Sequence, residues 1–129
     1  ALNYAGIACA KKAYKAYKEK GYKTKILAAA YRSHLHWSEF IGGDMIMTIP
    51  YQYQWKFNGS DVEVKSRIDD EIKPYYLDEL RKLPDFLKAY DEMKVEEFDA
   101  YGAVNVTLEQ FAAGYDDLVK IIRKFMIKY

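Results

Sequence analysis

The chain has 129 residues, which is the size of one domain or less. Hydrophobic residues make up 50% of it and charged residues 30%, which excludes a disordered chain, a collagen-like repeat and a disulfide scaffold. Cys9 is the single cysteine, so no intrachain disulfide forms and we expect a cytoplasmic protein. No apolar run approaches the roughly 18 to 20 residues of a membrane span, and we expect no membrane partner. The sequence begins with Ala1 instead of methionine, so we expect that something before it has been removed.

The net charge of +1 is unevenly distributed. Residues 1–32 carry eight basic side chains and one acidic one, a net charge of +7, and the remaining residues carry a net charge of −6. A basic segment with interleaved tyrosines is one pattern of a nucleic-acid surface. These lysines, however, fall where an amphipathic helix has its solvated side, so we expect no nucleic-acid partner.

The first half of the chain alternates between a helical spacing of residues and short apolar runs that are typical of strands. Small and aromatic residues recur every three or four positions from Asn3 to Lys20, which predicts a helix with Asn3 as its N-cap and Gly21 at its C-terminal end. Two short apolar runs, residues 24–30 and 45–49, predict strands that are buried on both faces.

Two further helices are expected around the second strand. Ser33 is the predicted N-cap of one that extends to about Ile41 and ends in a tight turn at residues 42–44. The other covers residues 51–57, directly after Pro50. The order helix, strand, helix, strand, helix is typical of parallel strands joined by helical crossovers.

The second half of the chain is predicted to be helical after an irregular stretch at residues 62–73. Pro74 and Pro84 each predict a helix start, the second helix extending to about Glu92. A short turn of helix is expected at residues 95–101. The last helix is marked by a capping box of Thr107 and Gln110. Its apolar stripe is formed by Leu108, Phe111, Ala112, Tyr115, Leu118, Val119, Ile122, Phe125 and Met126.

Two parallel strands cannot cover both faces and both edges of a sheet, and parallel sheets occur almost only inside larger, helix-clad assemblies. The pattern therefore predicts an α/β fold of which this chain is the end. Residues 1–61 are the expected last β/α units, and residues 62–129 are a C-terminal helical segment of the same domain.

Several stretches resemble the transaldolase family. The run GYKTKILAAAYR at residues 21–32, followed by IGGDMIMTIP at 41–50, is similar to the family's seventh and eighth strands. The preceding AYKEKGY at 16–22 resembles its sixth helix, and VEEF at 95–98 with the helix over 108–125 resembles its closing helices. The resemblance implies that the chain is the C-terminal fragment of a TIM (β/α)8 barrel, followed by a helical tail.

The resemblance also implies an activity for the full-length parent. Transaldolases move a dihydroxyacetone unit between sugar phosphates in the pentose phosphate pathway, through a Schiff base on a lysine. That lysine is expected on the fourth strand and the carboxylates that handle protons on the first and third, all upstream of Ala1. We therefore expect no catalytic residue in this chain, no cofactor, and no activity from the chain alone.

The part of the site expected here binds the substrate phosphate. In β/α barrels the phosphate is commonly held by the loops after strands seven and eight. Arg32 ends the seventh-strand candidate, and its guanidinium suits a bidentate phosphate contact; the helix start at Ser33 would add backbone N–H groups. The family motif usually has a serine two positions before this arginine, where this chain has Ala30.

Other candidate residues have simpler interpretations. His34 and His36 are two positions apart, which on a helix is the wrong spacing for chelating one metal, so no metal site is expected. Lys25 is a lysine in a strand and so a candidate for the Schiff base. It lies at the amino end of that strand, away from the catalytic end of a barrel, so we do not expect it to have this role. Cys9 is expected to be a small packing residue. The acidic run at residues 69–71 lacks the ligand spacing of a calcium loop.

An alternative function is a non-catalytic sugar-phosphate-binding or assembly module derived from the same family. A weaker one is an RNA-binding helical module that uses the basic segment. Because strand edges are left exposed, we also expect the fragment to self-associate. Substrate preference, transaldolase versus aldolase activity and oligomeric state are outside what the sequence determines.

Overall fold

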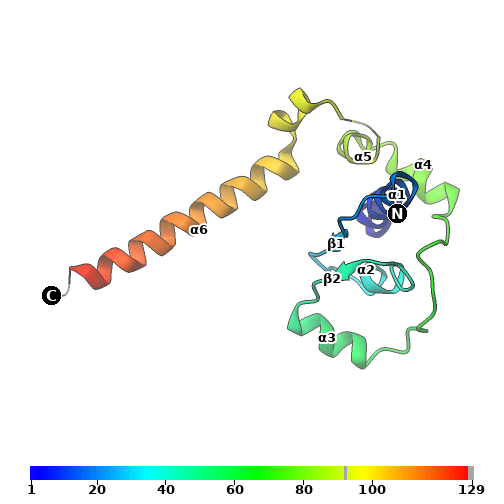
Figure 1. The fold of residues 1–129 in the computed structure, drawn as a ribbon, viewed down its shortest axis with the longest axis horizontal. Coiled ribbons are helices and arrows are strands. Elements are labelled where there is room, and N and C mark those ends of the chain that lie inside the picture. The colour runs from blue at the N-terminus through cyan, green and yellow to red at the C-terminus, as the bar shows by residue number, and fades with distance from the viewer. Residues whose placement is uncertain (92, 128–129) are drawn as a thin grey trace. The chain divides into compact units, whose positions relative to one another are not determined.

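The computed structural model of the chain describes residues 1–91 and 93–127. The chain has two units, residues 1–91 and residues 92–129 (Figure 1). The first contains η1 (Leu2–Tyr4), α1 (Ala5–Lys20), β1 (Leu27–Ala28), α2 (Leu35–Ser38), β2 (Ile46–Met47), α3 (Tyr51–Asn58), α4 (Pro74–Leu80) and α5 (Pro84–Tyr90). The second contains η2 (Val95–Ala100) and α6 (Gly102–Met126).

Helix α1 ends as the sequence predicts and begins differently. Gly21 is in the left-handed region, with φ of 63°, and its N–H donates to the Lys18 carbonyl. The prediction of Asn3 as N-cap is wrong, because Asn3 lies within the 3-10 turn η1 and Tyr4 precedes the helix without a side-chain cap. The chain therefore enters α1 through a continuous turn that needs no side-chain cap.

The two strands pair in parallel, as predicted. Leu27 is opposite Ile46 and Ala28 is opposite Met47. The prediction that both faces are buried is wrong, since Leu27 is 55% exposed and Ile46 is 50% exposed. Within residues 1–91 the sheet has only these two strands.

Helix α2 is shorter than the predicted helix over residues 33–41. It has one turn, its N-cap position is occupied by His34, and no side chain caps it, so the prediction of Ser33 as N-cap is wrong. The predicted tight turn follows, with φ of 90° at Gly42. The Ser66 Oγ atom lies 2.1 Å from where a Cβ on Gly42 would be, so the close passage of the later segment requires glycine here.

The core of the first unit forms around α1. Ile7 packs with Phe40 and Ile68 in one buried cluster. The neighbouring Ala8 packs with Leu80 and Phe86 in a second. Two successive residues of α1 therefore pack against two groups of segments. Ile7 contacts the connection between β1 and β2 and the segment 62–73, and Ala8 contacts helices α4 and α5.

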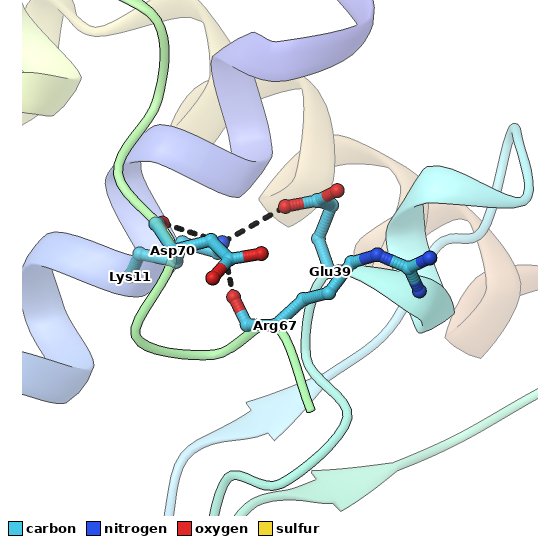
Figure 2. A network of polar contacts seen from close by, with 4 residues as sticks. All are labelled: Lys11, Glu39, Arg67 and Asp70. Atoms are coloured by element: carbon cyan, nitrogen blue, oxygen red, sulfur yellow. Dashed lines mark hydrogen bonds and ion pairs between the residues drawn. The ribbon is translucent and has the colours of Figure 1, made fainter. Parts of the chain in front are cut away.

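Residues 62–73 lack helix and strand, as predicted, and are held by a polar network instead. Figure 2 shows the Lys11 ammonium donating to a Glu39 carboxylate oxygen at 2.8 Å, the Arg67 carbonyl at 2.7 Å and the Asp70 carbonyl at 2.9 Å. The Lys11 side chain is 11% exposed and that of Glu39 is 14% exposed. All three ammonium protons therefore have acceptors in a half-buried setting.

Helices α4 and α5 both begin with proline at the first helical position, as predicted. Proline is favoured there because its missing N–H would have no acceptor within the helix. Helix α5 ends at Tyr90, and the predicted end at Glu92 lies outside the described residues.

The last helix is present but starts earlier than predicted. Helix α6 begins at Gly102, and the Thr107 hydroxyl donates to the Ala103 carbonyl at 2.8 Å from within the helix, so the predicted capping box of Thr107 and Gln110 is wrong. The apolar stripe is exposed, with Phe111 at 74%. Among the described residues, no helix has the length and apolar character needed to cross a membrane.

Candidate phosphate-binding site

The carboxyl ends of β1 and β2 lie at the same edge of the sheet because the strands are parallel. The Thr48 N–H donates to the Ala28 carbonyl at 2.9 Å, which holds the two exits side by side. Residues 29–34 connect β1 to α2, and residues 48–50 connect β2 to α3. In β/α folds this edge is where ligands bind.

The loop after β1 contains a strained residue. Ala30 has φ of 59°, and among the described residues it is the one non-glycine with a positive φ. A Cβ in the left-handed region costs roughly 1–2 kcal/mol, so surrounding contacts must hold this conformation. Such strain is often found at ligand-binding loops.

Arg32 is exposed at this edge, and its loop holds it at two points. Its backbone N–H donates to His36 Nδ1 at 2.9 Å. Its guanidinium Nη1 donates to the Tyr31 carbonyl at 2.9 Å. The remaining guanidinium N–H groups are available to an anion, because a guanidinium carries five such donors.

Ser33 lies beside Arg32 with its hydroxyl directed inward. The Ser33 Oγ is buried and has no hydrogen-bond partner among the described residues. The same holds for the Tyr31 hydroxyl and the Trp37 indole nitrogen. Buried polar groups without partners are uncommon, and they gather here in one loop and its short helix.

The loop is held by a cluster of three aromatic rings, those of Tyr31, Trp37 and Phe57. Tyr31 is fully buried, and its ring lies 6.0 Å from that of Phe57 in α3. The Trp37 ring lies 5.2 Å from Phe57. Since α3 follows β2 and α2 follows β1, these contacts join the two crossovers behind the strand exits.

His36 has a perturbed titration. Burial lowers the pKa of His36, a hydrogen bond to the Asn3 backbone opposes that shift, and the Arg32 charge lowers the pKa further. The neutral imidazole is therefore favoured, which is the form that accepts a hydrogen bond at Nδ1. Nothing in the sequence indicates this role, because the spacing of the two histidines bears only on metal chelation.

The other candidate residues are separate from this edge or engaged elsewhere. Lys25 forms an exposed ion pair with Asp44 at 2.6 Å. Cys9 is half-buried, and burial raises the pKa of its thiol. His34 is exposed. Among the described residues, no three His, Cys, Asp or Glu side chains are grouped so as to hold a metal ion.

A shallow hollow lies at the opposite, amino end of β1. It is lined by Tyr14, Tyr17, Lys18, Tyr22, Lys23, Thr24, Lys25, Ile26 and Asp44. The Lys25–Asp44 pair neutralises part of its positive charge. This hollow is the obvious competitor for an anion on the same unit.

The sequence is similar to one protein family over almost its whole length. The family model described as transaldolase/fructose-6-phosphate aldolase matches residues 2–122. The chain belongs to the transaldolase/fructose-6-phosphate aldolase family. No curated protein and no solved structure matched it.

Family membership confirms the resemblance to transaldolases and supports a transferase or aldolase type of enzyme in carbohydrate metabolism. The two parallel strands with flanking helices agree with part of the α/β fold of such a family member. The division into residues 1–61 and 62–129 of one domain remains a prediction.

Proposed function

We propose that this chain is the C-terminal part of a transaldolase-like β/α barrel and supplies the site for the substrate's phosphate group. One observation carries the proposal. In a chain of this family, the exposed Arg32 lies in the loop that follows the parallel strand β1, whose carboxyl end shares an edge with that of β2.

Arg32 has the chemistry for this role. A guanidinium donates two parallel hydrogen bonds to a phosphate and stays charged throughout the physiological pH range. The Ser33 hydroxyl is a second donor once the loop adjusts to a ligand. The one-turn helix α2 adds little through its dipole, because few peptide units are aligned in it.

We propose that the catalytic groups belong to the rest of the barrel. In the parent, a lysine amine on the fourth strand condenses with the ketose carbonyl and releases water. The resulting iminium withdraws electrons as the carbon–carbon bond breaks. This chain by itself is then inactive and binds sugar phosphates without converting them.

A non-catalytic binding or assembly module is the second candidate. It is favoured by the exposed apolar stripe of α6 and by the exposed strand residues Leu27 and Ile46. Such surfaces favour self-association of the chain or assembly with further protein.

The phosphate site is tested by calorimetry with fructose 6-phosphate and, as a control ligand, fructose. The chain should bind only the phosphorylated sugar. Arg32→Met should weaken binding at least about tenfold, the loss of a charge-assisted bidentate contact. Arg123→Met, which removes an arginine from the last turn of α6, is the matched control and should leave affinity unchanged. Equal affinity for both sugars would contradict the proposal.

The imine mechanism is tested on the complete reading frame that contains this segment. The protein is treated with fructose 6-phosphate and borohydride, and the trapped adduct is mapped by mass spectrometry. An adduct on a lysine upstream of Ala1 supports the transferase proposal. Absence of any adduct favours the binding or assembly module.

A further inference from the structure

The backbone N–H of Arg32 is held by a side chain from outside the loop. The Arg32 N–H donates to His36 Nδ1 at 2.9 Å, across the turn that leads into α2. The guanidinium contact to the Tyr31 carbonyl lies within the loop and cannot anchor it to the rest of the unit. The buried Tyr31 ring fixes the loop beside the strained Ala30, and the bond to His36 fixes it at Arg32.

His36 is itself held in place on several sides. Its ring meets the buried Tyr31 ring edge-on, with centroids 6.3 Å apart. A hydrogen bond to the backbone of Asn3, in η1, also acts on the ring and raises the pKa of His36. The imidazole is therefore a fixed acceptor, whereas a flexible surface side chain would be a weak one.

Taking the proposed phosphate site as the basis, we propose that His36 is its positioning residue: by accepting the Arg32 N–H at Nδ1, it fixes the direction in which the Arg32 side chain leaves the loop. The acceptor role requires a neutral imidazole with its proton on Nε2. A protonated imidazole has no acceptor, so the Arg32 amide loses its partner and the direction of the Arg32 side chain is no longer fixed.

The groups around His36 determine the pH at which it is protonated and the Arg32 amide loses its partner. The charged group facing it is Arg32, from the loop, and the titratable ring against it is Tyr31. Asn3 contributes a neutral backbone group. Because the pKa of His36 is lowered, the anchored loop is the form present at neutral pH.

Amide hydrogen exchange of Arg32, measured by NMR on the whole chain, tests the contact directly. The Ser38 amide in α2 is the reference, because it donates to the His34 backbone carbonyl at 3.0 Å and this bond does not involve the His36 side chain. In the wild-type chain, protection of Arg32 relative to Ser38 should fall as the pH is lowered through the titration of His36. His36→Asn places an amide oxygen near the position of Nδ1 and should keep the protection without its pH dependence.

His36→Leu removes the acceptor. It should lose the protection of Arg32 and weaken fructose 6-phosphate binding about threefold to tenfold, the factor for one hydrogen bond. His36→Asn should bind as the wild type does, within about twofold. His34→Leu, at an exposed neighbouring position, is the matched control and should change neither quantity.

Two results would overturn the inference. One is an Arg32 amide whose protection is the same at every pH in the wild-type chain, which requires no variant to fold. The other is His36→Leu with lost protection but unchanged affinity. If the wild-type chain binds no fructose 6-phosphate, the proposed function fails, and the Arg32 amide then decides separately whether His36 anchors the loop.

Discussion

At the scale of single residues, the proposed site depends on a short loop in which each position has a different task. Ala30 takes the unfavourable backbone conformation, Tyr31 is buried against Phe57, and Arg32 is exposed. The positive φ of Ala30 lies in the loop that follows the two-residue strand β1. Its position in the loop after β1 distinguishes Arg32 from the other arginines.

Replacing Ala30 by glycine tests the strain. Glycine adopts φ of 59° without a Cβ clash, but it also makes the unfolded chain more flexible. We expect Ala30→Gly to raise the free energy of unfolding by about 0.5–1 kcal/mol. Ala29→Gly, at a neighbouring position without a positive φ, should lower it by a similar amount. Denaturant unfolding measures both, and equal destabilisation by the two variants would show that Ala30 is unstrained.

His36 should make stability depend on pH. Its pKa is lowered in the folded chain, so the unfolded chain binds more protons between the folded pKa and the unfolded value near 6.5. Stability therefore falls as the pH drops through about 6.5 and levels off below the folded pKa. Thermal unfolding between pH 5 and 8 should show a smaller decline in His36→Asn than in the wild type. An identical decline in both would contradict this assignment.

At the scale of elements, the irregular segment 62–73 is fixed to α1 by one ammonium group. Lys11 donates to the Glu39 carboxylate and to two backbone carbonyls of that segment, as Figure 2 shows. Backbone carbonyls in an irregular segment lack ladder partners, so a lysine can satisfy them. The same segment places Ile68 in the core beside Ile7.

Lys11→Met keeps the aliphatic stem and removes the three donors. We expect the free energy of unfolding to fall by about 2 kcal/mol, because Glu39 and two carbonyls lose a charged partner in a half-buried setting. Lys65→Met is the matched control, since the Lys65–Glu63 pair is exposed and should contribute less than about 1 kcal/mol. Similar losses in the two variants would show that the Lys11 network has no special weight.

The elements that the sequence predicted well are those set by local chemistry. Gly21 ends α1, and the prolines begin α4 and α5, because glycine and proline restrict the backbone wherever they occur. The predicted caps at Asn3, Ser33 and Thr107 are wrong because the side chains of Ser, Thr and Asn also occur in turns, or bond to a carbonyl of the preceding helical turn, without capping a helix.

The site was predictable only in part. Arg32 was identified from its place at the end of an apolar run and from the family resemblance. The role of His36 depends on a turn that brings its Nδ1 within 2.9 Å of the N–H of Arg32, and the sequence alone does not determine which way the imidazole points. The burial of the strands was mispredicted because an apolar run indicates a tendency to be covered, without indicating what covers it.

At the scale of the whole molecule, apolar surface is left exposed on both units. In the first unit it includes Leu27 and Ile46, and in the second it includes Phe111 and Phe125. Exposed apolar residues and unpaired strand edges favour association. In the proposed parent, the remaining strands of the barrel would pair with β1 and β2.

The isolated chain should therefore self-associate. Light scattering across a range of concentrations should give a mass above that of one chain. Phe111→Lys with Phe125→Lys should reduce that mass if the α6 stripe mediates association, and should leave it unchanged if the strand edges do. A monomer at every concentration would contradict the expectation.

The central claim is that the sugar phosphate binds at the carboxyl ends of the strands, through Arg32. The most direct measurement is an NMR titration of the isotope-labelled chain with fructose 6-phosphate, observing backbone amides and arginine side chains. The account predicts saturable shifts at the Arg32 guanidinium and at Ser33, lost in Arg32→Met. Shifts confined to the hollow at the amino end of β1, around Lys18, Lys23 and Lys25, would contradict it.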